Sequence, residues 1–419
     1  MTIIGIDDTD SRESGMCTTY IGLKIAQELE ESNPKLTLVR LNPGVKYKTR
    51  GNASVAIHLD CNENKAFKVA SKIVDELSEL SDPNTQPGLV VAHGKQNDVS
   101  REVSRFCIDA IRTYHKIETA VGIIDEKEYL SRGWNGGRGL IGALAAVGAR
   151  GALNEWTYEY IAYREEMAWG TVRDVNSESV RESSREFYPY VWDSFDEKQK
   201  YAVCVPRTPC PVLYGIRGET PEVVERAAGS IISEPVGDVC LFSTNQGTDS
   251  HIQNGEIGSL KEGHSYTVEG IVSREVITKE GGHVFFGLKN DTDEIYCAAF
   301  EPTKQFRNYV RMLEIGDEIK VCGEVARGTL KLEKFQVQTL VKSIIENPIC
   351  NVCGGKMKSA GRLKGYRCKE CKTFEEEKRT IPLKRRIQMG WYEVPPCARR
   401  HLSKPLVRGG FNADIHPEI

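Results

Sequence analysis

Three aspartates stand close together near the start of the chain. Asp7, Asp8 and Asp10 directly follow the apolar run at residues 3–6. Carboxylates at this spacing repel one another, and a shared cation relieves that repulsion. Their hard oxygens suit Mg²⁺, which binds one or two carboxylates together with substrate phosphates. A turn capped by Asp and Ser side chains uses the same residue types, so the spacing alone leaves a magnesium site and a capped turn both open.

Two threonines follow the aspartates at the start of a predicted amphipathic helix. Thr18 and Thr19 precede Ile21, Ile25 and Leu29, which fall on one helical face. A hydroxyl at a helix start most often caps the backbone. It can also face a phosphate, because the free N–H groups of a helix start favour negative charge. The sequence is compatible with either use.

Two glycine-rich segments could hold phosphate groups. The first, at residues 42–54, carries Lys48, Arg50 and Gly51. The second precedes a small-residue helix and contributes Gly136, Gly137, Arg138 and Gly139. Neither is a Walker A motif, and each alone is a weak signal. Together with the aspartates they supply the parts of phosphoryl transfer, which are metal ligands, backbone donors and cationic groups.

Four cysteines near the C-terminus have the spacing of a zinc site. Cys350 and Cys353 form one C-x-x-C pair, and Cys368 and Cys371 form a second pair after 14 intervening residues. Four thiolates at this spacing close a tetrahedral zinc shell. Catalytic zinc keeps one coordination position open, so an all-cysteine site is structural. The alternative is four unrelated thiols, which this double pairing makes a poor explanation.

The same end of the chain is basic although the whole protein is slightly acidic. Residues 351–419 contain 16 Lys+Arg and 7 Asp+Glu, a balance of +9, while the full chain has a net charge of −3. The cations of this tail, together with Tyr366, Trp391 and Tyr392, predict a surface for a phosphate backbone and unpaired bases. In that prediction Arg399, Arg400 and His401 also belong to the nucleic-acid surface. A solvated charged surface is the alternative.

The order of predicted strands and helices divides the chain into four domains. Residues 1–154 alternate strand-like and helix-like stretches, with one strand expected at 118–125, and indicate a mixed α/β domain. Residues 155–256 follow the βαββαβ order of a ferredoxin-like domain. Residues 257–346 give five strands with a helical stretch between the third and the fourth, as in an OB-fold. Residues 347–419 hold the zinc ribbon and the basic tail. The predicted fold class is multidomain α+β.

Membrane association is not expected. No stretch of eighteen consecutive apolar residues occurs. The first residues read as a strand and lack the basic flank and long apolar stretch of a signal peptide. Thirteen cysteines in such a long chain do not suggest a disulfide framework. We therefore expect a cytoplasmic protein.

The first domain contains three distinctive segments, which read GIDDTDSRESGMCTT, KTRGNAS and GRGLIGA. With the ferredoxin-like domain, OB-fold and zinc ribbon that follow, they resemble the archaeal tRNA-Ile agmatinyl-cytidine synthetase (TiaS) family over essentially the full length. The resemblance implies a kinase-like first domain and an ATP-dependent ligase. Such an enzyme phosphorylates the 2-oxo group of the wobble cytidine of an isoleucine tRNA and replaces it with agmatine. The product, 2-agmatinylcytidine, changes decoding from AUG to AUA.

The resemblance also implies roles for individual residues. Asp7, Asp8 and Asp10 would be metal-binding catalytic acids, with Asp7 and Asp8 holding magnesium, and Thr18 would be phosphorylated by the enzyme itself. The implied cofactors are ATP, magnesium and structural zinc. The implied partners are tRNA and agmatine, and we expect a monomer.

Two other functions remain open on the sequence. A metal-dependent RNA nuclease or phosphatase would use the aspartates for hydrolysis and would need no ATP. A non-catalytic tRNA-binding protein would use only the OB-fold and the tail, and replacing Asp8 would then change no activity.

Overall fold

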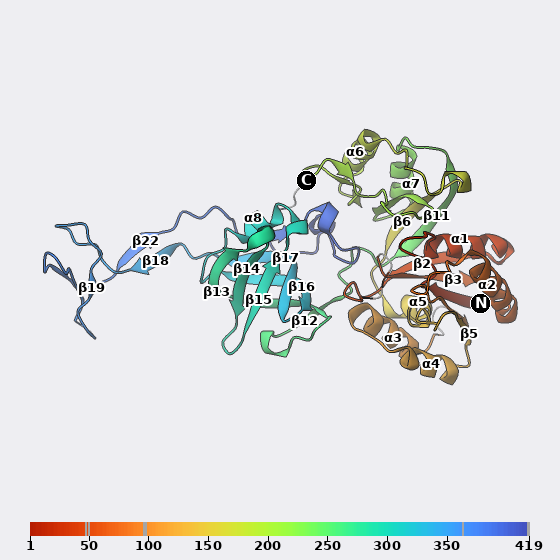
Figure 1. Cartoon of the computed structure of the whole chain (residues 1–419), viewed down its shortest axis with the longest axis horizontal. Coiled ribbons are helices and arrows are strands. Elements are labelled where there is room, and N and C mark those ends of the chain that lie inside the picture. The colour runs from red at the N-terminus through yellow and green to blue at the C-terminus, as the bar shows by residue number, and fades with distance from the viewer. Residues whose placement is uncertain (47, 49–50, 95–98, 363, 417–419) are drawn as a thin grey trace.

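The computed structural model describes residues 1–46, 48, 51–94, 99–362 and 364–416. Three parts follow one another along the long axis of the molecule (Figure 1). A large lobe with helices on a central sheet lies at one end, the β-barrel lies in the middle, and the C-terminal ribbon projects at the other end. The described chain contains no helix both long and apolar enough to cross a membrane.

The large lobe is built on one nine-stranded sheet. Its strands lie in the order β5-β4-β1-β3-β2-β11-β6-β10-β7. Their bounds are β1 (Thr2–Asp7), β2 (Lys35–Arg40), β3 (Ala53–Leu59), β4 (Gly88–His93), β5 (Leu130–Gly133), β6 (Thr157–Arg164), β7 (Val191–Trp192), β10 (Val212–Gly218) and β11 (Val236–Thr244). The first five strands belong to the predicted α/β domain and the other four to the ferredoxin-like domain. Parallel pairing of β11 with β2 joins the two parts edge to edge.

The first five strands carry helices on both faces. The helices are α1 (Thr18–Glu28), α2 (Glu63–Leu77), α3 (Arg101–Arg112), α4 (Ile117–Glu126) and α5 (Leu140–Ala152). Ile4 and Ile6 pack with residues of α1 and α2, whereas Ile3 packs with residues of α3 and α5. Because β1 is buried on both faces, its apolar residues run without interruption instead of alternating with polar ones.

One predicted element of this domain is wrong. The stretch 118–125 was expected as a strand and lies in helix α4. The edge strand β5 follows it and pairs with β4. A short apolar run has no period that separates a strand from a buried helix turn, and here Ala120 and Ile124 are buried at helical spacing.

The ferredoxin-like part has its expected topology. Helix α6 (Ser177–Glu186) follows β6, and helix α7 (Pro221–Gly229) follows β10. The sheet order β11-β6-β10-β7 is fully antiparallel and places the first and third strands in the centre. A small hairpin of β8 (Phe195–Asp196) and β9 (Tyr201–Ala202) is inserted before β10. The predicted βαββαβ order is therefore confirmed.

The middle part is an OB-fold barrel. Its strands are β13 (Ser265–Thr278), β14 (Val284–Lys289), β15 (Glu294–Ala299), β16 (Glu318–Ala326) and β17 (Thr329–Thr339). The short helix α8 (Phe306–Val310) lies between β15 and β16, as predicted. Pairing of β13 with β16 closes the barrel. The connecting strand β12 (Ile252–Asn254) adds to β13 at the side of the large lobe (Figure 1).

A two-stranded stalk carries the ribbon away from the barrel (Figure 1). The stalk pairs β18 (Ser343–Glu346) with β22 (Arg379–Pro382), and the ribbon contains β19 (Lys358–Ser359), β20 (Tyr366–Arg367) and β21 (Phe374–Glu375). The chain then returns, because β23 (Gly390–Glu393) pairs with β17 of the barrel. Residues 394–408, which we call the C-terminal strap, continue from β23 into contact with the large lobe.

Candidate active site

The three aspartates lie where β1 ends. Asp7 is the last residue of β1, and its Oδ1 accepts a 2.7 Å hydrogen bond from the Asp8 amide. Asp8 has a φ of +58°, in the left-handed region that Asp tolerates better than most residues. A Cβ at Gly142 of α5 would lie only 1.8 Å from Asp7 Oδ2. The glycine therefore lets the first turn of α5 press directly against this carboxylate.

Burial shifts the proton affinity of two of these carboxyl groups. It raises the pKa of Asp7 well above its ordinary value, and the neighbouring Asp8 adds to the shift. Burial also raises the pKa of Asp8, to about 6, although Arg138 opposes this from 2.6 Å. A cluster of this kind holds protons or cations, because ionised carboxylates without them are costly to bury.

Thr18 faces the same cavity from the start of α1. It is the first residue of the helix, and its Oγ1 accepts a 3.0 Å hydrogen bond from Thr9 Oγ1. Cys17 occupies the N-cap position, and its side chain makes no capping bond. Thr18 and Thr19 are buried and line the cavity. The capping interpretation therefore does not account for either hydroxyl.

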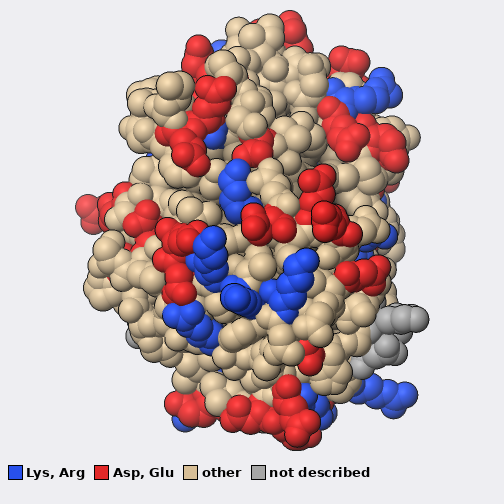
Figure 2. Space-filling view, turned by 90° about the vertical axis from the view of Figure 1, so that its right-hand side faces the viewer, with Lys and Arg blue, Asp and Glu red and all other residues tan. Residues whose placement is uncertain are grey.

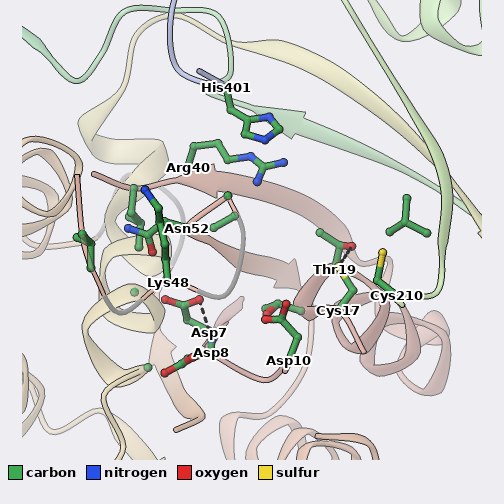
Figure 3. Close-up of a pocket in the computed structure, with 18 of the residues that line it drawn as sticks. Asp7, Asp8, Asp10, Cys17, Thr19, Arg40, Lys48, Asn52, Cys210 and His401 are labelled. Atoms are coloured by element: carbon green, nitrogen blue, oxygen red, sulfur yellow. Dashed lines mark hydrogen bonds between the residues drawn. The ribbon is translucent and has the colours of Figure 1, made fainter. Parts of the chain in front are cut away.

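The cavity has a volume of about 640 Å³ and lies between the two halves of the nine-stranded sheet. Asp7, Asp8 and Asp10 lie on one side, and Arg40 and His401 lie on the opposite side (Figure 3). Residues 203–212 of the ferredoxin-like part form another wall. This wall is close to the aspartate loop, because a Cβ at Gly15 would lie 2.0 Å from the Pro209 carbonyl oxygen.

The side opposite the aspartates carries a buried charged cluster. Glu159 of β6 lies 3.7 Å from Arg40 of β2 and 3.4 Å from Arg217 of β10. The side chain of Gln246 donates a hydrogen bond to Glu159, and its Oε1 lies 2.9 Å from His401 Nδ1. Glu159, Arg217 and Gln246 were not predicted from the sequence, because no local motif marks residues that become neighbours only in the folded protein.

Part of the predicted phosphate-holding set lines the cavity. Lys48, Gly51, Arg138 and Gly139 are among the lining residues. Burial lowers the pKa of Lys48, and the charge of Arg400 adds to the effect. Arg50 lies outside the described residues.

The glycines before Arg138 have a different place. Gly136 and Gly137 are not among the lining residues, and both have positive φ. The Gly137 amide donates to the Trp134 carbonyl over 2.7 Å, and the Gly139 amide donates to Gln86. These amides are thus used within the protein, and the glycines shape the turn that presents Arg138.

The predicted nucleic-acid surface of the tail is wrong for its last part. Trp391 and Tyr392 are buried against the barrel. Arg399 pairs with Asp193 and Glu393, and Arg400 pairs with Glu324 and Glu333. Charge counting along the sequence does not predict these pairs, because three of the four acidic partners come from other domains.

Cations of the ribbon itself remain exposed, among them Lys356, Lys358, Arg362, Lys364 and Arg367. The opposite end of the molecule presents a different surface. There several Lys and Arg side chains gather near the middle of the face, and Asp and Glu side chains lie above them and at the upper and lower edges of the view (Figure 2). Exposed cations are thus present on this face as well as on the ribbon.

The four cysteines of the ribbon converge as predicted. Their sulfur atoms all lie within 4.8 Å of one another, which no other set of three or more potential ligands does among the described residues. A hydrogen bond from the Thr373 hydroxyl, with help from backbone N–H groups, lowers the pKa of the Cys350 thiol to about 6. The Cys371 amide points at Cys368 Sγ over 3.4 Å. Thiolates held in this way are the donor set of structural zinc.

An OB-fold, a four-cysteine ribbon and a carboxylate-lined cavity together define a multidomain protein that acts on nucleic acid. Models of four known domains match the chain in sequence order. They are the TiaS TCKD domain at residues 3–133, the TiaS FLD domain at 137–251, an OB-fold nucleic acid binding domain at 259–346, and the TiaS C-terminal zinc ribbon domain at 347–387. The domain boundaries given above stay predictions.

A curated relative covers the whole chain. The tRNA(Ile) 2-agmatinylcytidine synthetase TiaS of Haloquadratum walsbyi is 46% identical, with 100% of both chains covered. This chain therefore belongs to the tRNA(Ile) 2-agmatinylcytidine synthetase TiaS family.

Solved structures agree with this assignment. A complex of TiaS with its isoleucine tRNA and ATP matches with a TM-score of 0.88, 41% identity and 99% of both chains covered. A complex of TiaS with its isoleucine tRNA, AMPCPP and agmatine matches with a TM-score of 0.86, 38% identity, and 99% of this chain and 98% of the other covered.

Proposed function

We propose that this protein is an ATP-dependent tRNA-modifying ligase that replaces the 2-oxo group of a wobble cytidine with agmatine. The observation that carries the proposal is the cavity that joins the buried aspartates, Thr18 and Arg138 in a chain of this family. Relatives described as complexes with an isoleucine tRNA, ATP and agmatine support the substrates. The product would be 2-agmatinylcytidine in an isoleucine tRNA, which would then read AUA instead of AUG.

Asp7, Asp8 and Asp10 would handle the metal and the nucleotide. The buried carboxylates fit a dication, because a bound cation replaces the protons that their raised pKa values otherwise retain. The three do not form a closed cage among the described residues. That is the arrangement expected for magnesium, which takes one or two carboxylates, here Asp7 and Asp8, and completes its shell with phosphates and water. Bound magnesium would neutralise charge on the phosphates.

Other predicted site residues would position the phosphates of ATP, and one of them would accept a phosphoryl group. Arg138 and Lys48 would neutralise phosphate oxygens, with Gly51 and Gly139 allowing close approach. Arg50, Gly136 and Gly137 complete the proposed nucleotide-binding set from their two loops. Thr18 is the proposed site of self-phosphorylation, since its hydroxyl is at the cavity and at a helix start.

The proposed reaction has two chemical stages. First the cytosine 2-oxo oxygen accepts a phosphoryl group from ATP, which turns a poor leaving group into a good one. The unprotonated amine nitrogen of agmatine then bonds to C2 and loses a proton. The C2–O bond breaks, and its electron pair leaves with the phosphate. For either stage the base must leave its stack to enter the cavity.

The barrel and the ribbon would hold the tRNA. OB-folds commonly bind nucleic acids, and the exposed cations of the ribbon suit a phosphate backbone. A cytoplasmic location, where tRNA is modified, is part of this proposal.

The test incubates the protein with tRNA transcripts, ATP and labelled agmatine. We expect label only in a transcript with a wobble cytidine, only with ATP, and none with Asp8→Asn. A transcript with a wobble uridine is the matched control. Cleavage or phosphate release without ATP would favour a nuclease or phosphatase instead. Binding of tRNA with no activity that depends on Asp8 would favour a non-catalytic protein.

A further inference from the structure

The C-terminal strap brings a side chain into the cavity from the far end of the sequence. The Gly247 amide donates to the His401 carbonyl over 2.7 Å, and the Asp249 amide donates to the Leu402 carbonyl over 2.8 Å. Leu402 is buried in the apolar cluster that contains Ile3 of β1. Backbone bonds and a buried anchor thus fix His401 between its neighbours.

Charge pairs hold the preceding strap residues on both sides. Arg399 contacts Glu393 of β23 over 2.7 Å and also pairs with Asp193 of the ferredoxin-like part. Arg400 contacts Glu333 of the barrel over 3.2 Å. The position of His401 is therefore set by the large lobe and the barrel together.

A relay of hydrogen bonds determines which nitrogen of His401 carries the proton. The Glu159 carboxylate accepts from the Gln246 side-chain amide nitrogen, which orients the Gln246 oxygen toward His401. That oxygen lies 2.9 Å from His401 Nδ1 and can only accept. Nδ1 must therefore donate, and in the uncharged ring Nε2 keeps a lone pair.

Gly51 lies beside that lone pair. A Cβ at Gly51 would come within 3.1 Å of His401 Nε2, so the glycine leaves this edge of the ring uncrowded by a side chain. His401 lines the large cavity and also an adjoining one of about 320 Å³. Figure 3 shows the ring directed toward the cavity above Arg40.

The surroundings keep the ring uncharged. Burial lowers the pKa of His401 well below its ordinary value, and the charges of Arg40, Arg217 and Lys48 act in the same direction. Beside these three cations, on the side of the cavity opposite the aspartates, a neutral imidazole is an acceptor that attracts an uncharged N–H group. The same cations disfavour an ammonium ion and favour the unprotonated amine that can attack a carbon.

We propose that His401 is a substrate-contacting residue whose Nε2 accepts a hydrogen bond from an N–H group of a bound substrate. Two substrates of the proposed function carry such a group, the primary amine of agmatine and the 4-amino group of the target cytosine. The inference rests on the proposed function. It adds to that function a hydrogen-bond acceptor, Nε2, that would orient the substrate, and the bonds from Glu159 through Gln246 keep this nitrogen unprotonated. The residue belongs to a segment that follows the zinc ribbon.

Two substitutions at His401 separate the two ring nitrogens. An Asn amide can take the place of Nδ1 and keep the bond to Gln246, but it leaves no acceptor at Nε2. A Gln side chain reaches the Nε2 position. We expect His401→Asn to lower kcat/KM for one substrate about tenfold, the effect of one lost buried hydrogen bond, and His401→Gln to lose less. The KM for ATP should not change.

Lys404→Ala is the matched control in the strap, because the Lys404 side chain pairs with Glu155 and does not line the cavity. The bond from Lys334 uses the Lys404 carbonyl and survives the substitution. We expect near-normal kinetics from this variant. For His401→Asn, a rise in KM for the amine would identify agmatine as the donor, and a rise in KM for tRNA would identify the cytosine.

Wild-type kinetics for His401→Asn would overturn the inference. Equal losses of kcat/KM in His401→Asn and Lys404→Ala would also overturn it, because the strap as a whole would then determine activity. So would a greater loss of kcat/KM in His401→Gln than in His401→Asn, because the bond to Gln246 would then be the important one. The wild-type protein is assayed alongside. If it incorporates no amine, the proposed function fails, whereas a failure of the inference leaves the wild-type activity intact.

Discussion

At the residue scale, the crowding of aspartates has a physical cost that a ligand can remove. Asp7 and Asp8 lie beside each other, and both have raised pKa values. Without a cation Asp7 therefore keeps its proton to a higher pH than a free aspartate, and Asp8, with a pKa of about 6, ionises above that pH beside Arg138. Such a cost at a cavity is typical of a site whose geometry serves a charged ligand and not stability alone.

Replacing Asp7 with Asn should stabilise the ligand-free protein at high pH. The folded pKa of Asp7 lies above its unfolded value of 3.8, so the carboxyl group has little effect at about pH 2.5, where both states are protonated. As the pH rises through the unfolded pKa, the unfolded state ionises first and the wild type loses relative stability. We expect Asp7→Asn to unfold a few degrees above the wild type at about pH 8 and at nearly the same temperature at about pH 2.5, by thermal unfolding without magnesium or ATP.

Asp82→Asn is the control with the opposite sign. The Ser11 hydroxyl lowers the pKa of half-buried Asp82. The ionised form of Asp82 therefore adds stability above the unfolded pKa, and this stability is lost as the pH falls through the folded pKa. Asp82→Asn should therefore unfold slightly earlier at pH 8. A lower unfolding temperature for Asp7→Asn than for the wild type at pH 8 would contradict the conclusion that the pKa of Asp7 is raised in the folded protein.

The two threonines at the start of α1 allow a matched comparison. Thr18 and Thr19 are both buried and both line the cavity, but Thr18 bonds to Thr9 whereas Thr19 contacts Cys17. We expect Thr18→Ala to abolish ATP-dependent self-phosphorylation and Thr19→Ala to retain it, as measured by phosphate incorporation and peptide mapping. Unchanged stoichiometry in Thr18→Ala would mean that another residue is the acceptor.

Residues with a local signature could be predicted from the sequence, and the others could not. The three aspartates lie within four positions of the sequence, and the four cysteines form two C-x-x-C pairs. Glu159 and Arg217 come from separate strands of the ferredoxin-like part, and Gln246 comes from the loop after β11. His401 was predicted on the nucleic-acid surface, because Arg399 and Arg400 precede it. Only the folded structure, through the strand pairing and the C-terminal strap, shows that these four residues are neighbours.

At the element scale, the ribbon is a small unit that depends on its four cysteines. Its buried set consists of Cys350, Met357 and Cys368, with two partly buried neighbours. So little apolar surface cannot stabilise a fold without a metal or a disulfide. The stalk of β18 and β22 separates this unit from the barrel, so it can be removed without touching either core.

Deleting the ribbon should weaken tRNA binding and leave the body folded. Glu346 pairs with Arg379 at the end of the stalk, so residues 347–378 can be replaced by a two-residue Asn-Gly turn. We expect a loss of tRNA affinity of about tenfold or more, with a shallower dependence on salt, because each lost phosphate contact reduces the slope by about 0.9. Binding is measured between about 50 and 200 mM KCl, values chosen to span the range over which such contacts weaken.

Deleting residues 348–419 is a different experiment. It also removes β23 and the C-terminal strap, whose Leu402 is buried in the large lobe. We expect that larger deletion to destabilise the body as well. Unchanged affinity and salt dependence in the ribbon-only variant would show that the ribbon does not hold the tRNA.

The elements that were predicted well are long and periodic. The strands of the barrel and the helices α2 and α3 have clear patterns, whereas 118–125 is a short apolar run that lies in α4. The aromatic residues of the tail were misassigned for a related reason. Trp391 and Tyr392 lie in β23, a strand that exists because it pairs with β17, more than fifty residues earlier. The surroundings that bury α4 and the strand that pairs with β23 both come from other parts of the chain, so the local sequence does not reveal them.

At the scale of the whole molecule, the chain returns on itself. The barrel and the ribbon lie beyond the large lobe along the long axis (Figure 1), yet the segment after the ribbon supplies a residue of the cavity in the large lobe. Contacts of the strap with the large lobe and the barrel hold the catalytic and nucleic-acid-binding parts in one arrangement. This arrangement would let an RNA held at one end present a single base at the other.

The central claim is that the cytosine 2-oxo oxygen leaves as phosphate. It is tested with a tRNA transcript whose wobble cytidine carries ¹⁸O at the 2-oxo position, incubated with the protein, ATP and agmatine. Mass spectrometry then follows the isotope. We expect one ¹⁸O in inorganic phosphate for each agmatine incorporated. Incorporation of agmatine with the ¹⁸O recovered in water or in AMP would contradict it.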